Sequence, residues 1–181
     1  MSHLKKLSVI SNDLFPREID IEVCLKTLKI YQKIEGDVNC VVWDASLVLA
    51  KYLETMSSQK SEFLSGIKVL ELGSGLGVVG LTAATLGAQV TLTDLPEALS
   101  LLRLNINENK QKISSMGGYA IAESLVWGDN SSELVKEKRL WESFYEKISD
   151  HFLMEKIPEE QQHTNFRSPD IILIKINKKK Y

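Results

Sequence analysis

Three glycines stand at alternate positions between an apolar run and a helical pattern, in the stretch VLELGSGLGVVG from Val69 to Gly80. This pattern predicts a strand, a tight glycine turn and a helix. Gly73, Gly75 and Gly77 lack the Cβ atoms that would keep a ligand away from the backbone, and glycine also adopts turn conformations that other residues resist. The amides that open the next helix, with Ser74 in the turn before them, would then face a bound ligand.

Two acidic residues are placed where they could meet the same ligand. Glu71 interrupts an otherwise apolar strand, where a carboxylate without a partner is costly to bury, so we expect it to touch the ligand or to brace the turn. Asp94 closes a second short strand, Val90 to Thr93, where a carboxylate can accept hydrogen bonds from both hydroxyls of a ribose. The turn and the two acids predict a nucleoside site, with an accidental glycine-rich turn as the alternative.

The spacing of the glycines distinguishes between classes of nucleotide-binding enzyme. A nicotinamide fingerprint, G-x-G-x-x-G, needs its third glycine where Val78 stands, so only G-x-G-x-G remains. A nicotinamide oxidoreductase is therefore disfavoured.

The composition fits one globular domain with a substantial core. The chain has 181 residues, 44% of them hydrophobic and 25% charged, and 22 basic against 24 acidic residues give a net charge of -2. This balance lacks the basic footprint of a nucleic-acid-binding protein, and no apolar run is long enough to cross a membrane. Cys24 and Cys40 show no disulfide or metal spacing and the three histidines are scattered, so we expect a soluble, cytoplasmic protein without a metal.

The residues before the glycine turn predict a hairpin and a helix. Alternating apolar residues from Glu18 to Ile34 indicate two short strands that turn at positions 26–27. From Val41 to Tyr52 the spacing becomes helical, with Asp44 placed as a cap. Trp43 stands at the entrance of that helix, where the pattern leaves a core tryptophan and a site residue equally open.

The segments after the turn alternate between helices and strands. We expect a helix over Leu76 to Leu86, and another from Pro96 to about Asn109, whose Asn105 and Asn109 are interpreted as solvated residues outside the site. A strand is expected from Tyr119 to Trp127. The ring of Trp127 could stack on an adenine, or Trp127 could be a residue at the rim of the site without this contact. The later elements are an amphipathic helix over Ser132 to His151 and strands over Phe152 to Ile157 and Ile171 to Ile176.

At these residues the chain resembles a known family. E-x-G-x-G-x-G followed by a strand-end aspartate is similar to the cofactor motif of the seven-stranded S-adenosylmethionine-dependent methyltransferases. Longer stretches resemble the small protein-lysine methyltransferases that modify chaperones, most closely the one that acts on the valosin-containing AAA ATPase. These stretches are CVVWDASLVLAKYLE (40–54), VLELGSGLGVVGLTAATLGAQVTLTDL (69–95), LLRLNINENK (101–110) and LVWGD (125–129).

The resemblance implies S-adenosylmethionine as the cofactor and a protein lysine as the methyl acceptor, on the valosin-containing AAA ATPase or another chaperone. It also places both tryptophans beside the cofactor. The predicted cofactor-binding residues are Trp43, Glu71, Gly73, Ser74, Gly75, Asp94 and Trp127. No catalytic residue is assigned, and we expect a monomer without nucleic-acid or membrane partners.

The implied fold is α/β, a Rossmann-like, mostly parallel sheet of the seven-stranded methyltransferase type in a single domain over residues 1–181. Its parts are an N-terminal hairpin (18–34), a cofactor-binding half (41–129) and a closing helix and strand pair (132–181). The family carries its fourth and fifth strands after the W-G pair at 127–128, but only about ten residues stand there, so we expect this chain to lack them.

The missing stretch would include the acidic D-x-x-Y-type motif that supports the methionine end of the cofactor and the incoming lysine in this family. We therefore expect a shortened methyltransferase with little or no activity. The alternative is a non-catalytic protein that binds the cofactor or a partner without turnover.

Overall fold

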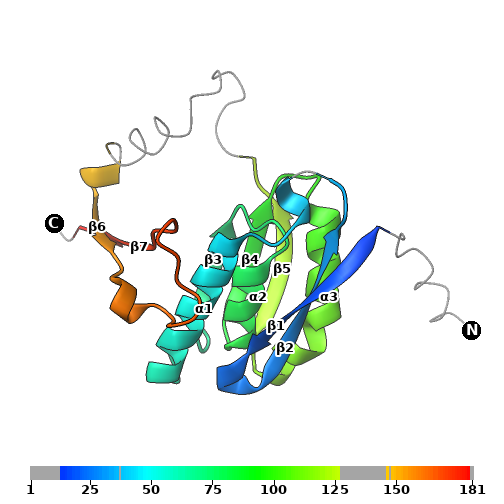
Figure 1. Cartoon of the computed structure of the whole chain (residues 1–181), viewed down its shortest axis with the longest axis horizontal. Coiled ribbons are helices and arrows are strands. Elements are labelled where there is room, and N and C mark those ends of the chain that lie inside the picture. The colour runs from blue at the N-terminus through cyan, green and yellow to red at the C-terminus, as the bar shows by residue number, and fades with distance from the viewer. Residues whose placement is uncertain (1–12, 37, 127–145, 147, 180–181) are drawn as a thin grey trace, which may run out of the picture. The chain divides into compact units, whose positions relative to one another are not determined.

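The computed structural model describes residues 13–36, 38–126, 146 and 148–179 of the chain. The chain divides into two compact units, Met1–Val126 and Trp127–Tyr181. The described part of the first unit holds a hairpin, helices and a parallel sheet, and that of the second holds an antiparallel strand pair (Figure 1). The single domain expected over residues 1–181 stays a prediction.

The predicted N-terminal hairpin is confirmed. Strands β1 (Leu14–Ile21) and β2 (Lys26–Lys33) pair antiparallel along their whole length. The turn comes earlier than predicted, over a 3-10 turn at Glu22–Cys24, and positions 26–27 already belong to β2. Leu25, with φ 53°, adopts the left-handed conformation that closes this turn, so the turn has no glycine to mark its place in the sequence.

A parallel sheet of three strands in the order β3-β4-β5 confirms the α/β class in the described residues. Its strands are β3 (Lys68–Leu72), β4 (Gln89–Asp94) and β5 (Tyr119–Ser124). Counted along this chain, a fourth and a fifth strand are present, which corrects the expectation that they are lacking. The full seven-stranded sheet is not confirmed, and the stretch 127–145, where the family's later strands were expected to be missing, lies outside the described residues.

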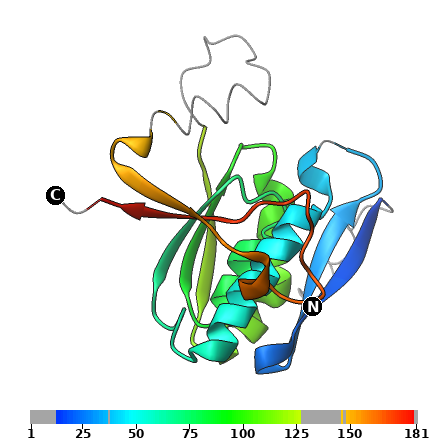
Figure 2. The same cartoon turned by 60° about the vertical axis from the view of Figure 1, so that its left-hand side comes forward.

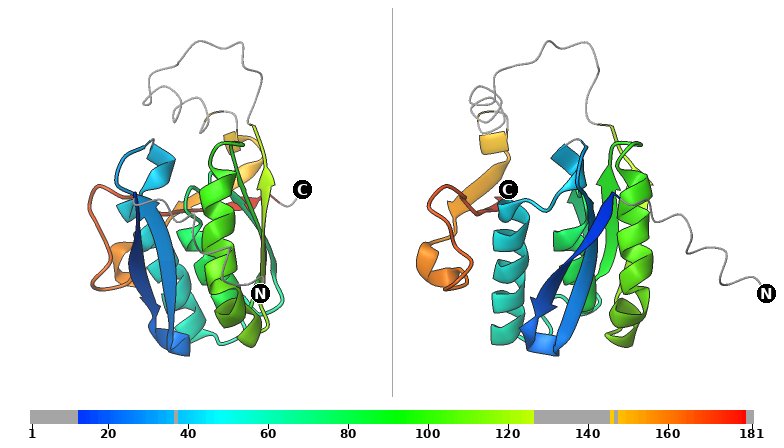
Figure 3. Two further views of the ribbon diagram at one scale, coloured as in Figure 1. Left: turned by 90° about the vertical axis from the view of Figure 1, so that its right-hand side faces the viewer. Right: turned by 45° about the vertical axis from the view of Figure 1, so that its right-hand side comes forward.

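Helices cover one face of this sheet. Helix α1 (Asp44–Gln59) precedes β3, while α2 (Val78–Thr85) and α3 (Leu99–Ser115) are the two crossovers between the parallel strands. Right-handed crossovers between strands laid down in order place both helices on the same face. The hairpin crosses this helical layer between α1 and α3, on the side away from the sheet (Figure 3).

The boundaries of α1 and α3 differ from the prediction. Trp43 takes the N-cap position of α1 with an extended backbone, so Asp44 is the first helical residue rather than the cap. Helix α3 starts at Leu99, three positions after Pro96, and runs on to Ser115 instead of ending near Asn109. Caps and helix ends depend on packing as much as on local residue type, and such shifts of a few residues are common.

The two faces of β3 differ in exposure. Val69 and Glu71 are half-buried, whereas Leu70 and Leu72 on the opposite face are 61% and 56% exposed. In the described part of the sheet, β3 pairs only with β4 and is an edge strand (Figure 2). The hydrophobic core of this unit therefore lies between the helices and one face of the sheet, and it continues under the hairpin.

Asn105 and Asn109 of α3 are fully buried, so their interpretation as solvated residues is wrong. Asn105 Oδ1 accepts a hydrogen bond from the Tyr31 amide (2.7 Å) and Asn105 Nδ2 donates to the Tyr31 carbonyl (3.2 Å). Asn109 binds the amide and carbonyl of Lys29 in the same way, at 2.9 and 2.8 Å. Four helical residues advance about 6 Å and two strand residues about 6.6 Å, so the two side chains match the edge of β2.

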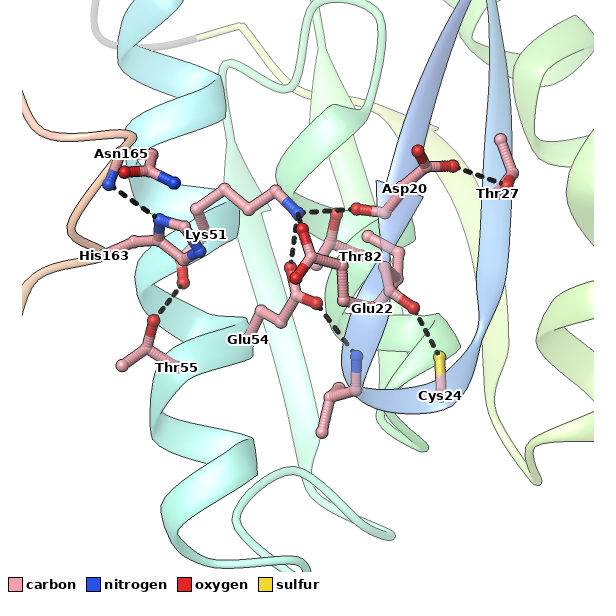
Figure 4. Close-up of polar contacts among 12 residues, drawn as sticks. Asp20, Glu22, Cys24, Thr27, Lys51, Glu54, Thr55, Thr82, His163 and Asn165 are labelled. Carbon is pink, nitrogen blue, oxygen red and sulfur yellow. Dashed lines mark hydrogen bonds and ion pairs between the residues drawn. The ribbon is translucent and has the colours of Figure 1, made fainter.

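A buried ion pair ties α1 to the other end of the hairpin (Figure 4). The distance from Lys51 Nζ to Glu54 Oε2 is 2.8 Å, and the two side chains are only 4% and 6% exposed. Lys51 also donates to the Asp20 carbonyl (2.7 Å), while Glu54 Oε1 accepts from the Val23 amide (3.1 Å). Both charges are thus compensated by partners, which is the condition under which such a pair tolerates burial.

In the second unit, β6 (Phe152–Lys156) pairs antiparallel with β7 (Ile174–Lys178), which confirms the predicted closing strand pair, although the second strand starts at Ile174 rather than at Ile171. A 3-10 turn over Glu159–Gln161 lies in the connection between them, and the Ile157 amide donates to the Leu173 carbonyl (2.9 Å). The helix predicted over 132–151 lies mostly outside the described residues. Among the helices described here, none has the length and apolarity needed to cross a membrane.

The ion pair predicts a large difference between two substitutions. Glu54→Ala leaves the Lys51 ammonium buried without its nearest counter-charge, so the free energy of unfolding should fall by about 3 to 5 kcal/mol. Glu22→Ala is the matched control, because Glu22 is 72% exposed and its Oε1 lies 3.9 Å from Lys51 Nζ. The control should change the free energy of unfolding by about 1 kcal/mol or less. Urea denaturation measures both, and equal losses for the two variants would contradict this account.

Candidate functional site

A cavity of about 760 Å³ runs along β3 and past the carboxyl ends of β3 and β4, between residues of α1 and α2. Its size falls within the range of about 300 to 1,000 Å³ that is common for small-molecule and cofactor sites. Most of its lining is apolar, with a few polar groups gathered at the glycine turn. Open α/β sheets bind ligands at this end of their strands.

The structure brings six of the seven predicted site residues to this cavity. They are Trp43, Glu71, Gly73, Ser74, Gly75 and Asp94. The seventh, Trp127, lies outside the described residues. The binding role of all seven stays a prediction, whereas their placement at one cavity is a feature of the fold.

The glycine turn is pinned to the end of β4. The Ser74 amide and hydroxyl both donate to the Thr93 carbonyl, at 3.0 and 3.1 Å, and the Thr93 hydroxyl donates to the Glu71 carbonyl at 2.6 Å. Gly75 adopts φ +50°, and a Cβ built on it would meet nothing within 4 Å. A side chain at this position would therefore strain the backbone and fill open space beside the turn.

Asp94 links the strand end to the turn. Its Oδ2 accepts a hydrogen bond from the Gly75 amide (2.6 Å), and its Oδ1 accepts one from the Leu95 amide (2.7 Å). A carboxylate offers about four lone-pair sites, so two backbone contacts leave acceptor capacity for a diol. The position and chemistry of Asp94 therefore fit the ribose contact predicted for it.

Glu71 braces the first turn of α2. Its Oε2 accepts a hydrogen bond from the Gly80 amide (2.9 Å), one of the amides that a helix start leaves without a helical partner. The pKa of Glu71 is raised to about 7, mainly by burial; the Gly80 amide and the Ser74 hydroxyl oppose this shift, and the charge of Asp94 adds to it. Of the two expected roles, the structure shows the brace, and the same residue also lines the cavity.

Trp43 belongs to the cavity rather than to the core. The residue is 56% exposed, and its Nε1 donates to the Val38 carbonyl (2.7 Å), which holds the indole at the cavity wall. The Val42 amide beside it donates to Gln32 Oε1 of β2 (2.8 Å). The hairpin therefore holds the segment that leads into α1 and presents Trp43.

Several wall residues were not predicted from the sequence. Leu95 follows Asp94 directly, and its place after a strand-end acid was the only signal available for it. The others were not distinguishable from core residues by pattern, because their apolar types serve either role. They are Val38, Val41, Val42, Leu49, Leu53, Val79 and Ala83.

The chemistry of these groups fits a nucleoside. Asp94 offers acceptors for a diol, Trp43 offers an exposed indole, and the turn brings backbone amides to the same place. Within the described stretches, no three His, Cys, Asp or Glu side chains gather closely enough to hold a metal ion. The prediction that the site uses no metal is not tested by that finding.

Known proteins match the part of the chain that contains this cavity. A family described as lysine methyltransferase matches residues 24–145. EEF1A lysine methyltransferase 3 of Xenopus tropicalis is 39% identical over 107 residues, which cover 58% of this chain and 46% of that protein. Protein N-lysine methyltransferase METTL21A of the same organism is 44% identical over 96 residues, covering 53% and 42%.

A relative from another organism matches over a larger number of residues. EEF1A lysine methyltransferase 3 of Mus musculus is 46% identical over 128 residues, which cover 64% of this chain and 52% of that protein. The chain thus spans about half the length of the curated relatives it matches.

The raised pKa of Glu71 predicts a pH dependence of stability. In the unfolded chain this carboxyl loses its proton near pH 4.5, and in the folded chain near pH 7. Between these values the folded state holds a proton that the unfolded state has lost, so the free energy of unfolding falls as pH rises through this window, by up to about 3 kcal/mol. Glu71→Gln keeps the acceptor for the Gly80 amide but cannot titrate. In this variant the free energy of unfolding should therefore change less with pH, which gives a flatter slope.

Urea denaturation of the wild type and of Glu71→Gln across that pH window measures the difference. Glu97→Gln is the matched control, because Glu97 is exposed and does not line the cavity. The control should keep the wild-type slope. An unchanged slope in Glu71→Gln would show that the carboxyl titrates normally in the folded chain.

Proposed function

The chain belongs to the lysine methyltransferase family, and we propose that the protein transfers a methyl group from S-adenosylmethionine to a lysine side chain of a protein substrate. The observation that supports this most strongly is the meeting of the glycine turn, Glu71 and Asp94 at one cavity. When bound, S-adenosylmethionine supplies a methyl group activated by a positively charged sulfonium. The names of the relatives, which specify protein-lysine methylation, support a protein lysine as the acceptor.

In this proposal the chain's own residues bind and orient the nucleoside. Asp94 accepts hydrogen bonds from the ribose hydroxyls while its contact with the Gly75 amide keeps the turn in place. Trp43 presents an exposed indole, and aromatic faces attract both apolar groups and cations. Trp127 is proposed to stack on the adenine, as the family resemblance implies.

The acceptor lysine must arrive as the neutral amine, because its lone pair is the nucleophile. Apolar surroundings lower the pKa of a lysine by removing water from the ammonium. Leu49, Leu70 and Leu72 line the cavity and supply such surroundings. No residue of the described part is assigned as a general base, so alignment of the nitrogen with the methyl group is the main contribution expected from the protein.

We propose the valosin-containing AAA ATPase or another chaperone as the substrate, on the sequence stretches that resemble methyltransferases of chaperones. The names of two relatives specify EEF1A, which makes EEF1A the competing substrate in any test. A cytoplasmic location and a monomeric state are part of the same proposal. Both Cys24 and Cys40 are free thiols, which supports a reducing compartment.

We propose that transfer by these 181 residues is slow or absent. No D-x-x-Y-type motif stands between Gly128 and Lys138, where the sequence reads GDNSSELVKEK. Binding that leaves the methyl group unaligned with the acceptor does not lower the barrier to transfer. The alternative function, a non-catalytic binder of cofactor or partner, shares the cavity and differs only in turnover.

The role of Asp94 can be tested by binding. Asp94→Ala should weaken the affinity for S-adenosylhomocysteine by about 1 to 3 kcal/mol, because charge-assisted hydrogen bonds to the ribose are lost. Glu97→Ala removes the same charge from an exposed position outside the cavity and should leave the affinity unchanged. Calorimetry on variants shown to be folded by circular dichroism measures both, and unchanged affinity in Asp94→Ala would remove this residue from the site.

The reaction itself is tested with labelled S-adenosylmethionine and two candidate substrates, the AAA ATPase and EEF1A, with full-length EEF1A lysine methyltransferase 3 as the positive control on EEF1A. The chain should bind S-adenosylmethionine in preference to NAD and methylate protein slowly or not at all. Preference for NAD would overturn the proposed function. Robust lysine methylation would support the methyltransferase and contradict the low activity proposed for these residues.

A further inference from the structure

The glycine turn is held from a second side, by a side chain that the predicted site does not include. Asn105 Nδ2 of α3 donates to the carbonyl of Leu76 (3.1 Å) as well as to that of Tyr31 (3.2 Å). Leu76 stands between Gly75 and Gly77, two residues with positive φ, and it is buried. A peptide flanked by glycines has unusual backbone freedom, so a fixed carbonyl there restricts the whole turn.

The Leu76 carbonyl lies outside the hydrogen bonds of α2. Gly77 is the N-cap of that helix, and its carbonyl accepts the first helical bond, from the Leu81 amide (2.9 Å). The Gly80 amide, which has no helical partner at this position, donates to Glu71 Oε2 (2.9 Å). Helix α2 therefore contributes an amide to Glu71, and Asn105 of α3 is the donor to the Leu76 carbonyl.

The turn is therefore held at three of its peptide groups by different parts of the fold. On one side Asp94 and Thr93 of β4 hold the Gly75 and Ser74 amides. On the other side Asn105 holds the Leu76 carbonyl and, through the same amide group, the backbone of Tyr31 in the hairpin. Movement of the hairpin edge would pull on the group that fixes the turn.

We propose that Asn105 is a positioning residue for the cavity: it fixes the glycine turn through the Leu76 carbonyl and thereby links cofactor affinity to the docking of the N-terminal hairpin. The link to cofactor affinity rests on the proposed function. The restriction of the turn does not, and it can be measured without a ligand.

Asn109 is a matched control on the same helix. It binds the amide and carbonyl of Lys29 as Asn105 binds those of Tyr31, and it is equally buried. Its other contacts lie within α3 and away from the glycine turn: Nδ2 donates to the Asn105 carbonyl (2.8 Å), and Oδ1 accepts from Lys112 Nζ (3.4 Å). Loss of Asn109 should therefore weaken hairpin docking without releasing the Leu76 carbonyl.

The test compares amide hydrogen exchange of residues 73–80 in the wild type, Asn105→Ala and Asn109→Ala. Both variants should lose protection in β2, whereas only Asn105→Ala should speed exchange in the turn, by about five- to tenfold for one lost hydrogen bond. In calorimetry, Asn105→Ala should also lower the affinity for S-adenosylhomocysteine by a similar factor, and by more than Asn109→Ala does. Equal exchange in the turn for the two variants would overturn the positioning role.

Two further outcomes separate this inference from the proposed function. A wild-type chain that binds no S-adenosylhomocysteine contradicts the proposed function, while the exchange difference still decides the role of Asn105. If Asn105→Ala does not fold, Asn105→Thr and Asn109→Thr replace the pair. Threonine nearly keeps the volume of asparagine, and its hydroxyl bonds a carbonyl one turn earlier in its own helix, so the donor to Leu76 is lost. Faster exchange of residues 73–80 in Asn105→Thr alone supports the inference, and equal exchange overturns it.

Discussion

The hairpin can lie against the helices only because its buried edge finds hydrogen-bond partners. A two-stranded hairpin has little stability alone. The edge of β2 that does not pair with β1 presents amides and carbonyls that are costly to bury unpaired. Asn105 and Asn109 meet this requirement for β2 with side-chain amides, each of which offers one acceptor and two donors. The segment leading to Trp43 is in turn held by Gln32 of the same strand. The walls of the cavity thus depend on the docking of an element that precedes them in the chain.

The two acids at the cavity differ in their surroundings. Asp94 accepts hydrogen bonds from two backbone amides, while burial raises the pKa of Glu71 to about 7. A positively charged ligand would favour the ionised form of Glu71, since an opposite charge nearby stabilises the charged form. In the proposed function this arrangement suits a sulfonium cofactor better than its neutral thioether product.

Local pattern was sufficient where local residues decide the structure. The strand, glycine turn and helix around Gly75 follow from residue types within a short stretch, and so does the hairpin as an element. The burial of Asn105 and Asn109 could not be predicted in this way, because their partners lie 74 and 80 positions away in the sequence. The turn at Glu22–Cys24 was misplaced for a related reason, since Lys51 and Glu54 of α1 hold its flanks. The sequence pattern left Trp43 open between the core and the site, and the structure places it exposed at the cavity wall, while its binding role stays a prediction.

The exposed apolar side chains of β3 line part of the cavity. Leu70 and Leu72 would be an unfavourable surface on an isolated sheet, yet both line the cavity together with Leu49 of α1. In the proposed reaction a lysine ammonium must lose its proton before the nitrogen can attack, and apolar walls lower the cost of that step by disfavouring the charged form. Recognition of the nucleoside uses the polar end of the cavity, at Asp94 and the turn. The apolar surface along β3 would act on the acceptor lysine instead. Affinity for the cofactor and deprotonation of the lysine would then depend on different residues of one site.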